Sequence, residues 1–386
     1  MCKSNISARF TVDGSDALEA RLAEICEQVA TRIRRLIPAD KLEAIVLGSG
    51  YGRGEGGVLR TANGEQPYND IEFYIFFRGS RLWNQRKYTQ PLDAVSRELS
   101  AQTGLHVEFK ADSLRRLRSM PICMFTYDLV SAHRVLAGPE NVFAGCEHHL
   151  RGPELPLSEA TRLLFNRCSG LLLVRELLGR TTLTADESDF VGRNLAKAQL
   201  ALGDAVLAAL GQYHWSARAR GERMEQLADE DVPELPTLQK HHRAGLEFKL
   251  HPQQMLKAPQ EFAIEHRELS ALAQRLWLWI EGRRLNRPFP TVKDYAFCEV
   301  NKCPEMLAAK NYLLTMRTFG AGAALSPLAN RYPRERLFNS LPLLLWNGEV
   351  SREPEIQRHL QRQLRTEASD WAGLVAAYKE IWPGYG

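Results

Sequence analysis

The chain has 386 residues, of which 44% are hydrophobic and 25% charged, the composition of an ordinary globular protein. Its formal net charge of +4 is too small to indicate a nucleic-acid partner, although it is compatible with binding a nucleotide. Its seven cysteines form no Cys-x-x-Cys pair, and no apolar run reaches the about 18 residues of a membrane span. We therefore expect a cytoplasmic protein without a structural zinc site, a nucleic-acid partner or a membrane partner. The oligomeric state is left open.

Apolar residues recur at steps of three and four from Leu18 to Leu36, which predicts a one-faced amphipathic helix. Asp16 and Glu19 are expected to cap its N-terminus, and Pro38 is expected to stop it. The next run, residues 42–47, is apolar without polar alternation, so we expect a strand that is buried on both faces.

This strand leads directly into a glycine-rich turn. The turn reads Gly48-Ser49-Gly50-Tyr51-Gly52-Arg53-Gly54-Glu55. A glycine-rich turn after a strand can bring backbone N–H groups and the Ser49 hydroxyl close to a phosphate. The segment that follows, residues 56–68, contains Asn63-Gly64 and Pro67 and predicts a turn-rich excursion between two strands. It is either a lid over a nucleotide or an ordinary surface loop.

Two carboxylates stand one residue apart at the start of the next apolar run, residues 70–77. Side chains alternate faces along a strand, so Asp70 and Glu72 point the same way, with their Cα atoms about 7 Å apart. A helix from Pro91 to Gly104 and a third strand, residues 105–110, are expected to follow, and Glu108 lies on that strand. If the two strands are neighbours, the three carboxylates converge.

Such a cluster would hold two Mg²⁺ or Mn²⁺ ions about 3.5–4 Å apart, because hard oxygen ligands suit these ions. Taken alone, an Asp-x-Glu pair is also explained by a strand face that meets solvent. The order of glycine turn, paired carboxylates and a third strand carboxylate favours a metal-dependent phosphoryl or nucleotidyl transfer site.

This order of elements resembles the DNA polymerase β-type nucleotidyltransferase superfamily over residues 40–112. Within it, residues 50–55 resemble the Gly-Tyr-Gly-Arg-Gly-Glu signature of the bacterial protein-PII uridylyltransferases and their relatives. The resemblance implies that Gly48 and Ser49 bind the nucleotide phosphates, and that Arg53 steadies the turn or touches a phosphate. It also implies that Asp70, Glu72 and Glu108 are the catalytic metal ligands. No histidine-aspartate hydrolase signature follows, so PII signalling is not expected.

Beyond residue 150 nearly every segment has helical periodicity, and Gly152-Pro153 reads as a hinge. We therefore expect an α+β chain, with a small mixed-sheet nucleotidyltransferase domain over residues 1–150 and an all-helical acceptor-binding domain over residues 151–386. The expected helices of the second domain cover residues 163–178, 189–210, 261–280, 304–319 and 353–381.

The helix over residues 189–210 carries a polar stripe that includes Lys197 and Asp204. One hypothesis places this stripe at the substrate cleft, with Lys197 on a nucleotide phosphate and Asp204 orienting the acceptor or acting as general base. The alternative is an internal pair between these two residues or an ion pair to another helix, since a partly buried carboxylate needs a partner. Further along the chain, the adjacent residues His241 and His242 are expected at the surface.

These observations favour an enzyme that moves NMP from an NTP to a small-molecule or protein acceptor, with Mg²⁺ or Mn²⁺ as cofactor. Two alternatives stay open. One is a nucleotidyltransferase that adds nucleotides to the end of an RNA, against which the small net charge argues. The other is a catalytically degenerate fold that binds a nucleotide for regulation.

Overall fold

A computed structural model describes residues 9–68, 70–347 and 353–385. The chain has an α+β fold, with a mixed sheet near the N-terminus and mostly helices after it, as the sequence predicts. It divides into two compact units. Unit 1 comprises Met1–Pro156, Leu210–Gln226 and Arg243–Gln253, and unit 2 comprises Leu157–Ala209, Leu227–His242 and Gln254–Gly386.

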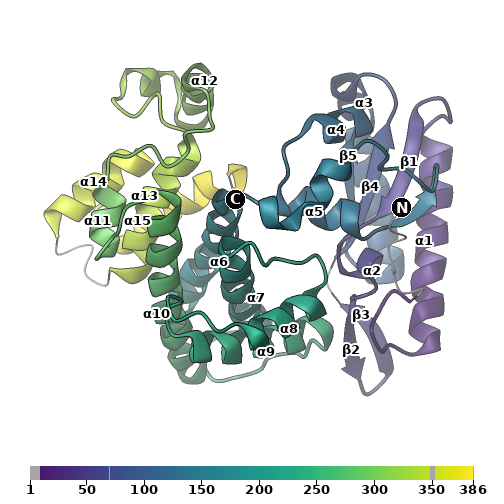
Figure 1. The fold of residues 1–386 in the computed structure, drawn as a ribbon, viewed down its shortest axis with the longest axis horizontal. Coiled ribbons are helices and arrows are strands. Elements are labelled where there is room, and N and C mark those ends of the chain that lie inside the picture. Colours follow the sequence, from purple (N-terminus) through teal and green to yellow (C-terminus); the bar gives the residue numbers. More distant parts are fainter. Residues whose placement is uncertain (1–8, 69, 348–352, 386) are drawn as a thin grey trace. The chain divides into compact units, whose positions relative to one another are not determined.

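A four-stranded sheet forms the centre of unit 1 (Figure 1). Its strands are β1 (Leu42–Leu47), β4 (Ile71–Phe77), β5 (Val107–Asp112) and β6 (Arg134–Ala137). They lie in the order β5-β4-β1-β6, where β1 is antiparallel to both of its neighbours and β4 is parallel to β5. The third strand begins two residues later than the sequence predicts.

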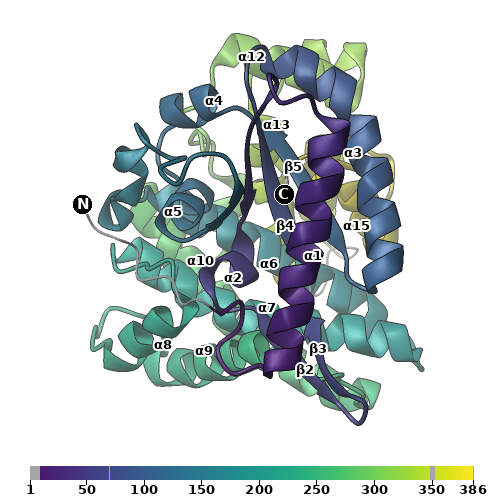
Figure 2. The ribbon, with the colours of Figure 1, turned by 90° about the vertical axis from the view of Figure 1, so that its right-hand side faces the viewer.

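Helices cover both faces of this sheet. Helices α1 (Asp16–Leu36) and α3 (Arg81–Thr103) pack on the face that carries Phe73 and Ile75, and Figure 2 shows the two helices side by side in front of the strands. Helices α4 (Leu114–Ser119) and α5 (Met124–Ser131) pack on the opposite face, against Tyr74 and Phe76. The expectation that β1 is buried on both faces is confirmed by its residues Ala44–Leu47, which are fully buried.

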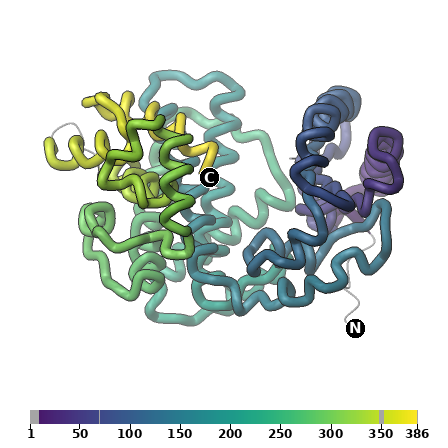
Figure 3. The backbone as a smooth tube through the Cα atoms, turned by 90° about the horizontal axis from the view of Figure 1, so that it is seen from above, coloured from purple at the N-terminus to yellow at the C-terminus, as the bar shows by residue number. Residues whose placement is uncertain are grey.

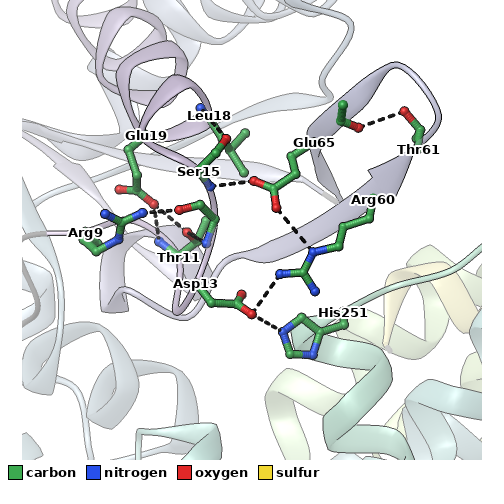
Figure 4. Close-up of polar contacts among 12 residues, drawn as sticks. Arg9, Thr11, Asp13, Ser15, Leu18, Glu19, Arg60, Thr61, Glu65 and His251 are labelled. Atoms are coloured by element: carbon green, nitrogen blue, oxygen red, sulfur yellow. Dashed lines mark hydrogen bonds and ion pairs between the residues drawn. The ribbon is translucent and has the colours of Figure 1, made fainter.

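The N-terminus of α1 differs from the prediction. Ser15, and not Asp16, is the N-cap residue, and its hydroxyl accepts a hydrogen bond from the Leu18 N–H. Glu19 turns back instead to accept hydrogen bonds from the N–H groups of Phe10 and Thr11 (Figure 4). The Glu19 side chain therefore binds the segment that precedes the helix and does not cap the helix N-terminus.

Residues 57–68 form a β-hairpin instead of an irregular loop, with the predicted turn at Asn63-Gly64 between its strands, and the lid role stays a prediction. Its strands are β2 (Gly57–Thr61) and β3 (Gly64–Tyr68), which pair in antiparallel register around Asn63-Gly64. The hairpin is attached to the segment before α1 by Arg60, which donates to Asp13 at 2.9 Å, and by Glu65, which accepts from the Ser15 N–H (Figure 4). Its position is thereby fixed against α1 within unit 1.

Helix α3 begins at Arg81, ten residues before the predicted start, with Pro91 inside it. The proline was the expected first residue because its fixed φ suits that position. The predicted end is confirmed: Gly104 closes the helix in a left-handed conformation with φ of +71°.

Unit 2 is built from packed helices, of which α6, α7 and α10 contact one another. The remaining helices are shorter, and Figure 3 shows the yellow C-terminal segment beside the green one, where α14 and α15 pack on α13. The bounds are α6 (Leu157–Leu178), α7 (Ala185–Ala209), α10 (Pro259–Arg284), α11 (Val292–Phe297), α12 (Ala308–Phe319), α13 (Pro333–Trp346), α14 (Pro354–Leu364) and α15 (Trp371–Ile381). The sequence did not separate α14 from α15 and missed α11 and α13.

Two further helices lie between α7 and α10 in the chain. They are α8 (Ala217–Gln226), which belongs to unit 1, and α9 (Leu235–Leu250), which begins in unit 2 and ends in unit 1. Among the helices of the described residues, none combines the length and the apolar character that crossing a membrane requires.

Candidate active site

The predicted turn and the predicted carboxylates meet at one edge of the sheet of unit 1. Because β1 and β4 are antiparallel, the end of β1 lies beside the start of β4, and the Gly48 N–H donates to the Glu72 carbonyl at 3.1 Å. Because β5 runs parallel to β4, its start lies at the same edge. Three segments that are distant in sequence thus place their polar groups together.

Glu72 and Glu108 are direct register partners on β4 and β5. Both side chains are partly exposed, with 22% of the Glu72 side chain and 40% of the Glu108 side chain open to solvent. Lys110 lies between them: its Nζ is 3.0 Å from Glu72 Oε2 and 3.6 Å from Glu108 Oε2. Two of the three predicted ligands are therefore brought together, with an ammonium group between them.

Tyr74 contacts both Glu72 and Lys110 of this cluster. Its hydroxyl donates to Glu72 Oε2 at 2.7 Å, and its ring lies 5.7 Å from the Lys110 ammonium. Burial, together with the negative charges of Glu72 and Glu108, raises the pKa of the Tyr74 hydroxyl. The phenol therefore stays protonated and acts only as a hydrogen-bond donor to Glu72.

Asp70 precedes the first residue of β4 and is exposed. The described residues include no group of three or more His, Cys, Asp or Glu side chains arranged to hold a metal ion. The donor set that the structure does assemble consists of two carboxylates, those of Glu72 and Glu108, with the Lys110 ammonium between them. The assignment of Asp70 as a third ligand stays a prediction.

The glycine turn approaches the cluster closely. It continues into the short helix α2 (Ser49–Arg53), and Ser49 has a φ of +59°, a left-handed conformation that costs a non-glycine residue free energy. A Cβ atom at Gly48 would lie 2.5 Å from the Tyr74 ring, and one at Gly52 would lie 2.4 Å from the Leu47 carbonyl oxygen. Glycine is thus required for the backbone to pass this close to β1 and β4.

The other residues of the turn hold neighbouring elements in place. Arg53 forms an ion pair with Asp128 of α5 at 2.8 Å, and Tyr213 also donates to Asp128 at 3.3 Å. The buried Tyr51 hydroxyl lies 3.0 Å from the Gly57 carbonyl oxygen and 2.9 Å from that of Tyr68, to one of which it donates, and it accepts from the Tyr68 N–H at 2.8 Å. It thereby joins both strands of the hairpin. Arg53 is thus bonded to α5, and the phosphate contact predicted for it stays a prediction.

Glu55 is buried and binds the N-terminus of α8. Its carboxylate accepts hydrogen bonds from the Ser216 hydroxyl at 2.6 Å and from the Ala217 N–H at 2.8 Å. Burial alone would raise the pKa of Glu55, but these hydrogen bonds and nearby arginines outweigh it, and the pKa is lowered. The conspicuous Arg-Gly-Glu portion of the turn is therefore explained by contacts within the fold.

The two predicted residues of unit 2 lie on α7. Lys197 is exposed, whereas Asp204 is buried, with its Oδ1 3.0 Å from His242 Nε2 on α9. The prediction of a surface position for His242 is wrong, because only 1% of this residue is exposed. Its ring packs over Gly203, where a Cβ atom would lie 2.4 Å from it. The roles proposed for Lys197 and Asp204 stay predictions.

No protein-family model matches the sequence, and a search of curated proteins finds no significant match.

Sequence reasoning missed Tyr74 and Lys110 as members of the cluster. A signal was available for both, because Tyr74 shares a strand face with Glu72, and Lys110 shares one with Glu108. The strand pattern identifies the face of each side chain, but it does not reveal that a lysine side chain reaches across to the neighbouring strand.

Proposed function

We propose that this chain is a nucleotidyltransferase that moves NMP from an NTP to a small-molecule or protein acceptor with the aid of a divalent cation. The observation that carries the proposal is the register pairing of Glu72 with Glu108 at the edge where β1 enters the Gly48–Ser49 turn. The same edge thus offers carboxylates for a cation and a tight glycine-serine turn for phosphates.

The carboxylates of Glu72 and Glu108 would hold Mg²⁺ or Mn²⁺, and Asp70 lies two residues before Glu72 in the chain, just outside β4. When bound, such a cation offsets phosphate charge and makes an acceptor hydroxyl easier to deprotonate. The chain's own contribution is positional: β4 and β5 fix the two carboxylates, and the Tyr74 hydroxyl fixes the orientation of Glu72.

The phosphate side of the site is assigned to the Gly48–Ser49 turn, to which Gly48 contributes the close backbone approach and Ser49 the hydroxyl. The Gly48 N–H is engaged by the Glu72 carbonyl, so the turn and the carboxylate strand are rigidly connected. The Ser49 hydroxyl is the phosphate-binding group in this proposal, because it is the first side chain after β1 and its backbone has a left-handed conformation. Retention of such a strained residue is common at ligand sites.

The direct trial uses α-labelled and γ-labelled NTPs with Mn²⁺ and a fractionated cell extract as the source of acceptor. We expect transfer of the α-label together with release of labelled pyrophosphate, and a loss of at least about 100-fold in Glu72→Gln and Glu108→Gln. The matched control is Glu27→Gln, an exposed carboxylate on α1. Equal turnover in wild type and Glu72→Gln would contradict the proposal.

Two observations favour the alternative of a nucleotide-binding protein without transfer activity. Lys110 already neutralises part of the carboxylate charge, and the described residues assemble no three-ligand metal cluster. Under this alternative the NTP binds at the turn but stays intact in the labelled assay. The same experiment therefore separates the two functions.

A further inference from the structure

Lys110 occupies the space between the two carboxylates of the candidate site. Its Nζ lies 3.0 Å from Glu72 Oε2 and 3.6 Å from Glu108 Oε2, and the side chain passes along the Tyr74 ring. Both carboxylates and the lysine come from the paired strands β4 and β5. The ammonium group is therefore an intrinsic part of the cluster and is supplied by the fold itself.

The charges explain why an ammonium stands there. Two carboxylates on directly paired residues of neighbouring strands repel each other, and a cation between them removes this repulsion. One lysine offsets one of the two negative charges, so the cluster keeps less charge to attract further cations. Two divalent ions at a shared site normally require more carboxylate charge than remains here.

We propose that Lys110 takes the place of one of the two divalent cations, so that the site binds a single Mg²⁺ or Mn²⁺ ion together with the NTP. This inference rests on the proposed nucleotidyltransferase function and replaces the two-ion arrangement that the sequence predicts. Lys110 acts as a positioning residue: it holds Glu72 and supplies a fixed positive charge at the cluster.

The Tyr74 contact strengthens this assignment. The phenol donates to Glu72 Oε2, which is the same oxygen atom that the Lys110 ammonium binds. Two donors on one oxygen orient the carboxylate and direct its second oxygen away from the lysine. In this arrangement Glu72 has one oxygen for the protein's own cation and one for a divalent ion.

The test counts bound Mn²⁺ by electron paramagnetic resonance while the protein is saturated with a non-hydrolysable ATP, GTP, CTP or UTP analogue. We expect one Mn²⁺ per chain for the wild type and two for Lys110→Met, which keeps the apolar stem and removes the charge. Lys110→Arg keeps the charge and is expected to bind one.

Lys87→Met is the matched control, because Lys87 also lies over a tyrosine ring, 5.1 Å from the centre of Tyr88, without a carboxylate pair. It should bind one Mn²⁺, like the wild type. Two ions in the wild type, or one ion in Lys110→Met, would overturn the inference while leaving the proposed function intact. Absence of nucleotide-dependent Mn²⁺ binding in the wild type would instead overturn the proposed function, and the inference with it.

A second readout does not depend on metal. In metal-free protein, Lys110→Met should lower the thermal midpoint, and adding Glu72→Gln to it should restore most of the loss, since the repulsion is then removed. A Lys110→Met midpoint equal to that of the wild type would contradict the assigned charge compensation.

Discussion

The two units each contain a cluster that joins a glutamate, a basic residue and a tyrosine hydroxyl, and the two clusters differ in how completely they are closed. In unit 2, Glu281 is fully buried and accepts two hydrogen bonds from Arg284, both at 2.7 Å. Thr161 and Tyr295 donate to the same carboxylate at 2.6 and 2.7 Å. Both oxygens of Glu281 are thus engaged within the fold.

In unit 1, the cluster of Glu72, Glu108 and Lys110 is open. Both hydrogen bonds to Glu72 reach the same oxygen, Oε2, and within the described part of the chain Oε1 accepts none. The same residue types therefore serve two purposes in the two clusters. A closed set of partners stabilises a fold, whereas a partly exposed set with spare acceptors can receive a ligand.

The largest expected effect belongs to the closed cluster. Glu281→Gln leaves the buried Arg284 guanidinium without its counter-charge, which should lower the free energy of unfolding by about 3–5 kcal/mol. Urea denaturation measures this change, with the exposed Glu268→Gln on the same helix as the control. If Glu281→Gln lowered the free energy of unfolding by less than about 1 kcal/mol, burial and a full set of partners would not distinguish the Glu281 cluster from the Glu72 cluster.

Glu55 is a carboxylate of unit 1 whose hydrogen bonds are made within the fold. It therefore tests whether a full set of internal partners, and not the location in unit 2, makes a carboxylate stabilising. Glu55→Gln should cost about 1.5–3 kcal/mol near neutral pH, because the carboxylate caps α8 from a buried position. Its pKa is lowered from 4.5, so the stabilisation is present above pH 4.5 and is lost as the pH falls through the lower folded-state pKa.

Unfolding curves of the wild type and Glu55→Gln should therefore converge as the pH falls below 4.5. A difference in stability that stays constant over this range would mean that the charge of Glu55 is not what stabilises α8.

Glu72 should contribute much less to stability than Glu281, because Glu72→Gln removes its repulsion from Glu108 together with its attraction to Lys110. Glu72→Gln is expected to change the free energy of unfolding by less than about 1 kcal/mol, since partly exposed ion pairs are screened by solvent. The same variant should lose Mn²⁺-dependent nucleotide binding. A destabilisation as large as that of Glu281→Gln would indicate that Glu72 is a structural residue.

The smallest effect on stability is expected from Ser49→Gly. Relief of the left-handed strain at φ of +59° opposes the added chain entropy of glycine in the unfolded state, so the change should stay within about 0.5 kcal/mol. Loss of the hydroxyl should nevertheless weaken nucleotide binding about tenfold, the value of one hydrogen bond. Calorimetry that finds unchanged affinity would remove Ser49 from the phosphate site.

Sequence patterns predicted the parts of the fold that depend on apolar periodicity. The run 42–47 has no polar residue apart from Glu43, and the structure shows a central strand between two helical layers. The shared face of Glu72 and Glu108 also follows from strand alternation, and only the pairing of β4 with β5 had to be learned from the structure.

The errors have identifiable physical causes. Pro67 argued against a strand, but it lies in a two-stranded hairpin, where a missing N–H is tolerated more easily. Pro91 suggested a helix start, although α3 passes through it. His242 was expected at the surface because charged residues surround it in the sequence, whereas tertiary packing against Gly203 and Asp204 buries it.

The central claim, that β1, β4 and β5 form a cation-dependent nucleotide site, is tested most directly by calorimetric titration of the wild type with each of the four NTPs, with and without Mn²⁺. We predict that at least one NTP binds only when Mn²⁺ is present, and that Glu72→Gln and Glu108→Gln each weaken this binding at least about tenfold. Failure of the wild type to bind any NTP, or equal binding by both variants, would contradict the account.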